Sequence, residues 1–157
     1  MSRRKVEGDA MAKMESTVTI ARPVEKVFAF FLALDENAAR VDPSATSVVK
    51  TPDGPAQAGT TFRFRQKNLG KIRETVTRFT DVVPNQVIEF EAEIGPMRPK
   101  CALTFDQTDE GTKVTFRGDS IPVGPFKFLS PLLNRKGQQV WSQRLTRTKT
   151  VLEASAP

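Results

Sequence analysis

The amino-acid sequence predicts an α+β fold in which a long C-terminal helix covers the apolar face of an antiparallel sheet. Two observations support this prediction. Between residues 44 and 121, segments in which apolar and polar residues alternate follow one another, with turn residues between them. From residue 130 to about residue 154, apolar residues instead recur at helical spacing. Such a helix, with about 24 residues, would be roughly 36 Å long, and this is enough to cross a sheet whose strands span about 30 Å.

The N-terminal part of the chain predicts one strand followed by two short helices. Residues 1–13 are expected to form a disordered tail, and residues 14–21 alternate as in a half-buried strand. Pro23 suits the first turn of a helix, because its missing N–H group costs nothing there. This helix is expected to run to about residue 34, and Asp35 then provides the N-cap of a second short helix.

Further strands are expected after the two helices, with turn signals between them. They comprise residues 44–51, 60–67, 71–83, 87–94, 100–108 and 112–121. Consecutive strands joined by short turns form an antiparallel meander, so the sheet should contain about six to seven strands. One face carries basic residues on some strands and glutamates on a neighbour, which suits cross-strand pairing in water. The other face is apolar and needs the C-terminal helix as its cover.

The composition excludes several kinds of active site. The chain contains no histidine, no tyrosine and a single cysteine, Cys101. Neither a Ser-His-Asp nor a Cys-His device can be built from these residues, and a thiolate zinc site needs more cysteines. The sequence contains no glycine-rich phosphate loop and no aspartate-rich calcium loop. We therefore expect no metal and no cofactor, and acid–base chemistry would depend on Asp, Glu, Lys, Arg or Cys101.

Length and apolar content describe an ordinary globular protein. The 157 residues are the size of one domain, which we place at residues 14–157. No apolar run approaches the roughly 18 residues that a membrane span needs, and the basic N-terminus lacks the apolar segment of a secretory signal. Since a single cysteine also offers no disulfide framework, a cytoplasmic location is expected.

The order of the elements, with two sequence motifs, resembles the SRPBCC superfamily. These are START-like proteins with a helix-grip fold, and they include polyketide cyclases/dehydrases and birch-pollen-allergen-like proteins. The first motif is "ARPVEKVF" at the start of the first helix, and the second is the hairpin "TRFTDVVPNQVIEFE". The resemblance implies a curved sheet wrapped around the C-terminal helix, with the two short helices closing one end. It also implies a cavity for a lipid, sterol, polyketide or other apolar ligand.

The cavity implied by the resemblance would be lined by inward-facing residues of the sheet and of the long helix. The candidate lining comprises Phe31, Phe62, Phe64, Gln66, Glu74, Phe90, Ala92, Cys101, Leu103, Phe105, Phe116, Leu133, Trp141 and Leu145. The alternative is a filled core, because each buried Phe or Leu contributes about 1.5–3 kcal/mol and a small domain needs most of this free energy to fold. Small inward residues such as Ala92 leave room for a ligand, or they let the helix approach closely.

Glu74 is the candidate catalytic residue. Counted from Ile72 and Val76, it lies on the apolar face of its strand, where desolvation would favour the neutral carboxyl and let it donate or move a proton. A β-bulge would instead turn this side chain to solvent, and an ion pair with Arg78 or with an arginine of the long helix is a further alternative. Gln66 could orient a polar group of a ligand, or it lies at the end of the sheet near water.

Three other features have both a simple and a functional interpretation. Cys101 is expected to be an inert apolar residue, because no histidine exists to activate its thiol. Trp141 is more often part of the core than a ligand platform at such a helical position. The segment "IPVGPFKFLSPLL" before the long helix is expected to be a packed connector, with a mobile lid as the alternative.

Basic residues concentrate in the C-terminal part of the chain. They are Lys127, Arg135, Lys136, Arg144, Arg147 and Lys149, against the single acid Glu153. A solvated helix face explains them most simply, and attraction to an anionic membrane surface or an acidic protein partner is the sharper interpretation. Nucleic acid is not expected as a partner, because the aromatic residues are predicted to lie inside the sheet.

The sequence leaves three functions open. The leading hypothesis is the binding, and the carriage, of a hydrophobic small molecule or lipid without catalysis. The alternative is an enzyme of the cyclase or dehydratase kind that uses Glu74 as its acid or base. The third is a protein-interaction module that uses the basic C-terminal helix. Neither the identity of the ligand nor the oligomeric state follows from the sequence.

Overall fold

The computed structural model describes residues 13–155 with the exception of Leu69. Apart from Lys13, the expected tail therefore lies outside the described residues. The elements in chain order are β1 (Met14–Ile20), α2 (Val24–Leu32), α3 (Leu34–Val41), β2 (Ala45–Thr51), β3 (Thr61–Asn68), β4 (Lys71–Val83), β5 (Val87–Glu93), β6 (Lys100–Thr108), β7 (Gly111–Asp119), η1 (Gly124–Leu129) and α4 (Ser130–Ala154).

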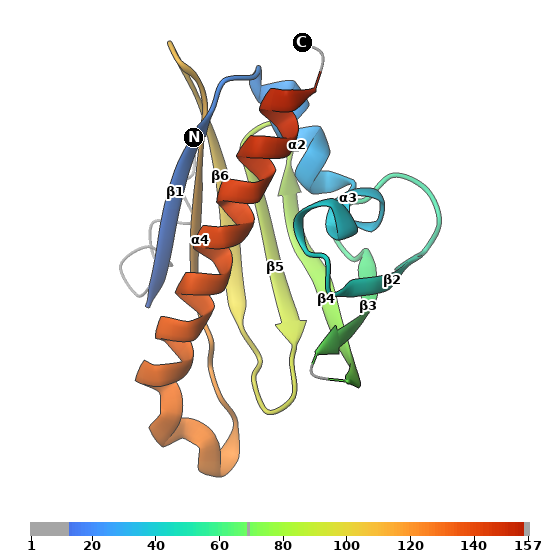
Figure 1. Cartoon of the computed structure of the whole chain (residues 1–157), viewed down its shortest axis with the longest axis vertical. Helices are drawn as coiled ribbons and strands as arrows, with labels where there is room; N and C mark the ends of the chain where they lie inside the picture. The colour runs from blue at the N-terminus through green and yellow to red at the C-terminus, as the bar shows by residue number, and fades with distance from the viewer. Residues whose placement is uncertain (1–12, 69, 156–157) are drawn as a thin grey trace.

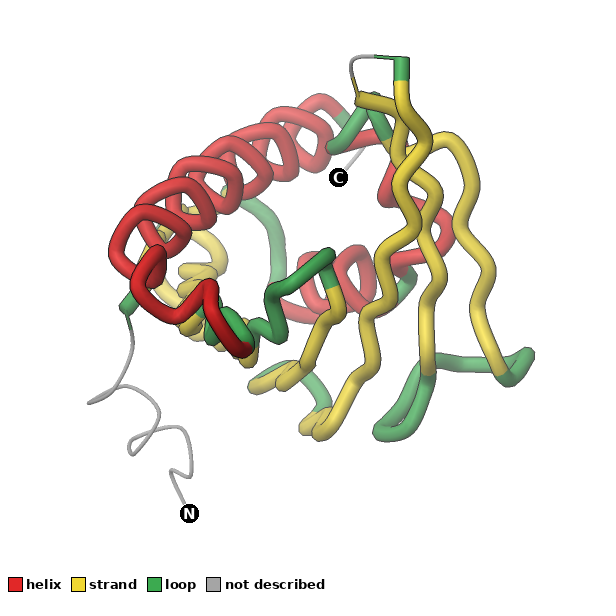
Figure 2. The backbone as a smooth tube through the Cα atoms, turned by 90° about the horizontal axis from the view of Figure 1, so that it is seen from below, coloured by secondary structure: helices red, strands yellow, loops and turns green. Residues whose placement is uncertain are grey.

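All the described strands belong to one seven-stranded antiparallel sheet, in the order β1-β7-β6-β5-β4-β3-β2. Strands β2 to β7 form a meander, and β1 completes the sheet by pairing with β7. Figure 1 shows α4 lying across one face of the sheet, with α2 and α3 near one end and η1 near the other. In Figure 2 the strands curve around the side on which the helices lie. The predicted α+β architecture with a covering C-terminal helix is confirmed.

The two short helices differ from the prediction at their junction. Helix α2 ends at Leu32, and Ala33, with φ −85° and ψ 56°, separates it from α3. Asp35 consequently lies inside the first turn of α3 rather than at its N-cap, and its carboxylate is 3.7 Å from the Lys50 ammonium. An acidic residue in the first turn still stabilises the helix, because it complements the positive end of the helix dipole.

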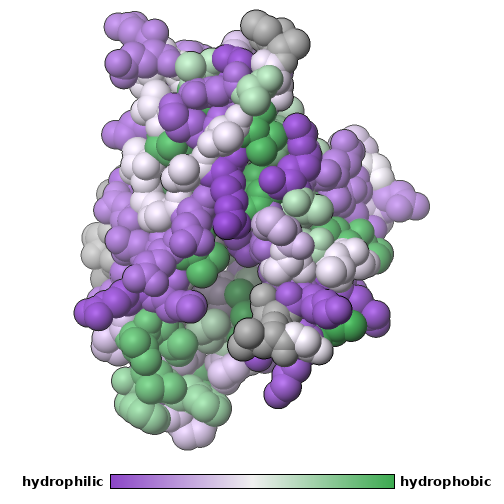
Figure 3. All heavy atoms as spheres, viewed as in Figure 1, coloured by the Kyte–Doolittle hydropathy of each residue, from purple (hydrophilic) through white to green (hydrophobic). Residues whose placement is uncertain are grey.

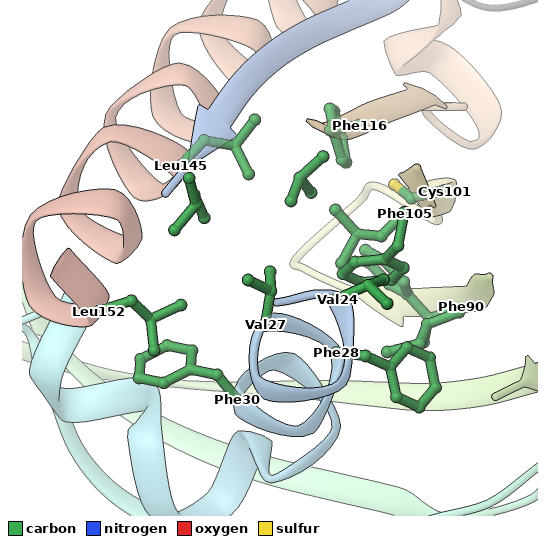
Figure 4. Close-up of a cluster of buried hydrophobic side chains, with 14 of the residues drawn as sticks. Val24, Val27, Phe28, Phe30, Phe90, Cys101, Phe105, Phe116, Leu145 and Leu152 are labelled. Carbon is green, nitrogen blue, oxygen red and sulfur yellow. The ribbon is translucent and has the colours of Figure 1, made fainter. Parts of the chain in front are cut away.

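The hydrophobic core lies between α2, the C-terminal half of α4 and the concave side of the sheet (Figure 4). Val27 and Leu145 are fully buried, and Leu152 is nearly so. Phe28 packs edge to face on Phe105, with ring centroids 5.2 Å apart. Side chains of this kind contribute about 1.5–3 kcal/mol each when they leave water, so this cluster stabilises the packing of the helices on the sheet.

Glu74 lies on the outer face of β4, and the prediction that it is part of an apolar wall is wrong. Its neighbour Thr75 is buried, whereas Glu74 is exposed and lies 3.6 Å from Arg63 on the adjacent strand. The prediction assumed that Ile72 and Val76 mark the inward face of the strand. Both instead share the outer face with Glu74, and Ile72 is exposed. A β-bulge farther along β4 shifts the alternation, so apolar residues at its two ends point to opposite sides of the sheet.

Helix α4 begins at Ser130, where the helical spacing of apolar residues predicted its start. The 3₁₀ helix η1 runs directly into it, so Ser130 is already helical and makes no side-chain capping bond. One turn later, Asn134 is buried and its Oδ1 accepts a hydrogen bond from the Ser120 N–H at 2.9 Å. Gly137 lets α4 approach β1 closely, because a Cβ at this position would lie 2.5 Å from Met14 Sδ.

In the part of the chain that the structure describes, no helix combines the length and the apolar character that crossing a membrane requires.

Candidate functional site

The concave side of the sheet is packed differently at its two ends. At the α2 end most inward side chains are buried in the core cluster (Figure 4). Toward the η1 end, some inward residues of β3, β4 and the N-terminal half of α4 are only half-buried, namely Phe64, Thr77, Leu133 and Trp141, although Thr75 beside Phe64 is buried. Figure 3 shows a hollow beside this half of α4, with apolar atoms in its depth. These half-buried side chains mark the η1 end of the concave side as the candidate site.

Trp141 is the central aromatic residue of this site. Its ring stacks on Phe116 of β7 with centroids 4.3 Å apart and an interplanar angle of 10°. The ring of Phe90 on β5 lies 5.7 Å away, and the Arg144 guanidinium carbon lies 5.2 Å from the Trp141 centroid. The Trp141 ring is thus held in place by a stacked ring and by a cation over it, and its half-buried part presents ordered apolar surface.

A polar network around Asp42 joins the end of α3 to β3 and α4. The Asp42 carboxylate accepts hydrogen bonds from the Ser44 hydroxyl at 2.6 Å and from the Ser44 N–H at 3.0 Å. Gln66 Nε2 donates to it at 2.9 Å, and the Arg144 guanidinium donates at 3.2 Å. Burial alone would raise the pKa of Asp42, but the Ser44 hydrogen bonds and the Arg144 charge outweigh it and lower the pKa below its usual value. The network therefore holds an ionised carboxylate at the edge of an otherwise apolar site.

Cys101 lies on the same concave side and has no acid–base role at neutral pH. Burial raises the pKa of its thiol to about 12, an effect that the positive charge of Arg144 only partly opposes. The thiol faces Gly118 on β7. A side chain at position 118 would place its Cβ 2.8 Å from the Cys101 sulfur. The expectation that Cys101 behaves as a small apolar residue agrees with this protonated, buried state.

The residues expected to line a cavity divide into groups. The buried ones, most of them in the core cluster, are Phe62, Phe90, Ala92, Cys101, Leu103, Phe105, Phe116 and Leu145. The half-buried ones are Phe31, Phe64, Gln66, Leu133 and Trp141. Glu74 is on the outer face. The structure thus brings the predicted aromatic residues together on one side of the sheet, and it leaves only some of them with accessible surface.

Two residues of the site were not assigned to it from the sequence, Asp42 and Arg144. Arg144 stands within the apolar stripe of the C-terminal helix, and a cation in such a stripe is the one signal that could have located it. Asp42 follows the second helix in the turn sequence "DPS", which indicates a turn but not a tertiary partner. The two residues are 102 positions apart, so their pairing is visible only in the folded chain.

Two further hollows lie outside the concave side. One, of about 1180 Å³, is open to solvent along the outer surface of α4 and is lined mainly by polar residues such as Gln138 and Ser142. The other, of about 340 Å³, lies over the charged pairs on the outer face of the sheet, including Arg78 and Glu91. Within residues 13–68 and 70–155 there is no group of three or more His, Cys, Asp or Glu residues that could hold a metal ion.

Comparisons with known proteins agree with this architecture. The chain matches the family model described as polyketide cyclase/dehydrase and lipid transport over residues 11–153. A search of curated proteins found no match.

Solved structures with low sequence identity share the fold. Ara h 8.0201 is 13% identical with a TM-score of 0.68, covering 90% of this chain and 97% of that chain. Protein TTHA0849 from Thermus thermophilus is 19% identical with a TM-score of 0.69, covering 91% and 99%. The ZhuI aromatase/cyclase from Streptomyces sp. R1128 is 17% identical with a TM-score of 0.70, covering 89% and 92%. At these identities the similarity shows a common helix-grip fold.

The family match includes every described strand and helix and ends within the last turn of α4. It agrees with the resemblance carried by the "ARPVEKVF" and "TRFTDVVPNQVIEFE" motifs. The chain belongs to the polyketide cyclase/dehydrase and lipid transport family.

Proposed function

We propose that this protein binds a hydrophobic small molecule or lipid between the N-terminal half of α4 and the concave side of the sheet, and that it acts as a binding or carrier protein. The observation that carries the proposal is the incomplete burial of two inward aromatic side chains, Phe64 and Trp141. Water in contact with apolar surface costs about 25 cal/mol per Å². A ligand that covers these rings gains this free energy without any rearrangement of the packed end.

The polar network around Asp42 indicates which end of the proposed ligand is polar. Arg144 and Gln66 are half-buried at the edge of the aromatic site, and both donate to the Asp42 carboxylate. Polar groups in partly desolvated positions of this kind pair with polar groups of a ligand and disfavour purely apolar ends. We therefore expect a molecule that is apolar over most of its length, with a polar end near Arg144.

Trp141 supplies the assay for this proposal. It is the only tryptophan, and the chain contains no tyrosine, so protein fluorescence reports on this site alone. Delipidated protein should be titrated with fatty acids, sterols and polyphenols, with native mass spectrometry and thermal shift as independent measurements. We expect a saturable change of the Trp141 emission for at least one class. If no compound changes the emission, raises the melting temperature or appears as a bound species, the proposal is wrong.

A matched pair of variants tests the location. Thr77 is half-buried on the concave side, whereas its neighbour Val76 lines the hollow on the outer face. Thr77→Phe would fill space next to Ala92, its partner on β5, and should weaken binding roughly tenfold or more. Val76→Phe adds the same ring to the other side and should leave binding unchanged. An equal loss in both variants would show that the ligand does not use the concave side.

The structure does not favour the other two functions. Glu74 on the outer face cannot serve the proposed site as acid or base. Arg144 and Arg147 both donate to the end of α3, and Lys149 donates to a carbonyl of β1, so these cations hold α4 in place. A cytoplasmic location and the absence of a cofactor stay predictions from the sequence.

A further inference from the structure

A cluster of exposed apolar side chains projects from the η1 end of the molecule. Among the described residues, five of the seven exposed large apolar side chains gather there, and we call this surface the apolar lobe. It comprises Ile121, Val123, Phe126, Phe128 and Leu132. Figure 3 shows the apolar lobe as a continuous hydrophobic surface at one end of the molecule, beside the hollow. The other two residues, Val49 and Ile72, lie on strands away from it.

The backbone at the start of the apolar lobe is hydrogen-bonded to the neighbouring turn, although the side chains of the lobe face water. The N–H of Val123 donates to the Pro96 carbonyl at 2.9 Å, and the N–H of Arg98 donates to the Ile121 carbonyl at 3.1 Å. These bonds tie the segment to the turn between β5 and β6, and η1 then continues directly into α4. The phenylalanines therefore follow a hydrogen-bonded segment and lie in a regular 3₁₀ helix, and an exposed apolar cluster of this kind marks an interaction surface.

The charged side chains within the apolar lobe and directly after it are basic. Lys127 lies within it, and Arg135 and Lys136 follow on the first turns of α4, all three exposed. No aspartate or glutamate occurs between residues 120 and 152. The nearest acid in the chain, Asp119, accepts a hydrogen bond from the Ile121 N–H at 3.3 Å. A projecting apolar surface bordered by cations complements a partner that has an anionic surface layer and an apolar interior below it.

We propose that the apolar lobe docks on an anionic lipid bilayer. Phe126 and Phe128 would enter the interface between headgroups and acyl chains, and the three cations would contact the anionic headgroups. A second copy of the chain is a poorer occupant, because a two-fold contact would bring the same cations face to face. The docking does not depend on the proposed ligand, but it would bring the hollow beside the apolar lobe close to the lipid.

Flotation of the full chain with vesicles tests the proposal. Vesicles of phosphatidylcholine alone should be compared with vesicles that contain about one third phosphatidylglycerol. We expect binding to the anionic vesicles that weakens as salt is added, and little binding to the neutral ones. Phe128→Ser should weaken the binding roughly tenfold or more, since Phe128 is 78% exposed and has most of its surface to bury. Ile72→Ser is the matched control, because Ile72 is 65% exposed but lies outside the apolar lobe, and it should have no effect.

Three results would overturn the proposal. They are no binding to anionic vesicles, the same loss in Ile72→Ser as in Phe128→Ser, or a dimer in light scattering that Phe128→Ser dissociates. The last result would identify the apolar lobe as an interface between copies. The Trp141 titration of Phe128→Ser separates this proposal from the ligand proposal. If vesicle binding is lost while ligand binding in solution is kept, the lobe acts as we propose; if no ligand binds but the vesicle results hold, only the ligand proposal fails.

Discussion

Replacing Arg144 by Met should destabilise the protein and should do so through Asp42. Methionine keeps an apolar stem beside Trp141 but removes the charge and the hydrogen bond at 3.2 Å. The side chains of Arg144 and Asp42 are 31% and 20% exposed, so this pair lies between the exposed and the buried case. Exposed pairs contribute about 0–1 kcal/mol, whereas breaking a buried pair costs about 3–5 kcal/mol. Because Ser44 and Gln66 still donate to the carboxylate, we expect a loss of about 1–2 kcal/mol.

Urea unfolding followed by circular dichroism measures this loss. At an m-value of about 2 kcal/mol per molar, the midpoint should fall by about 0.5–1 M urea. Arg63→Met is the matched control, because the Arg63–Glu74 pair is 3.6 Å apart and its side chains are 58% and 53% exposed. Its midpoint should hardly change, since an exposed pair of this separation contributes less than about 0.5 kcal/mol.

The pH dependence identifies Asp42 as the cause. The folded-state pKa of Asp42 is lowered, so the ionised carboxylate contributes stability above its unfolded pKa of about 3.9. This contribution disappears as the pH falls through the lower folded-state value. The penalty of Arg144→Met should therefore be complete at neutral pH and should shrink as the pH is lowered below about 4. A penalty that stays constant down to the lowest pH at which both proteins fold, or that equals the penalty of Arg63→Met at neutral pH, would refute this reasoning.

Two further predictions concern the strand pair that carries Cys101. Gly118→Ala would place a Cβ 2.8 Å from the Cys101 sulfur, so it should destabilise the protein by about 1–3 kcal/mol, and Cys101→Ala in the same chain should recover part of this loss. Simple additivity of the two changes in urea unfolding would contradict the contact. Because burial raises the pKa of the Cys101 thiol to about 12, a thiol reagent at about pH 8 should label the native protein far more slowly than the unfolded one. Equal labelling rates would show that Cys101 is accessible from solvent.

Much of the fold was predictable because the concave side is consistently apolar over three strands. In β5, β6 and β7 the residues that alternate inward in the sequence are buried in the structure, as Ile88, Leu103 and Phe116 illustrate. Period-two alternation fixes the register wherever one face is dry. Helix α4 was predictable because its apolar residues recur at helical spacing over 25 residues.

The face of β4 was not predictable from alternation. Its inward positions near the site hold threonines, Thr75 and Thr77, whereas Ile72 and Val76 occupy the outer face. Threonine is a good strand residue on either face of a sheet. The alternation therefore did not show which face of β4 points inward. Thr75 is buried and Thr77 is half-buried, so inward positions of this strand are closed to water without apolar side chains. The wrong placement of Glu74 coincides with the candidate site.

The uneven packing of the molecule also explains how a site of this kind can exist in a small domain. Contacts hold α4 to one side of the sheet at both of its ends. Near the C-terminus Lys149 donates to the Thr19 carbonyl at 2.7 Å and the Glu153 carboxylate accepts from the Ala21 N–H at 2.8 Å, and near the N-terminus Asn134 accepts from the Ser120 N–H at 2.9 Å. Leu145 and Leu152 fill the core at the C-terminal end. Because these contacts hold α4 against the β1 and β7 side of the sheet, its N-terminal half need not pack down on β3 and β4. Incomplete packing there loses little of the total stability, and it leaves aromatic surface on which a ligand can gain free energy.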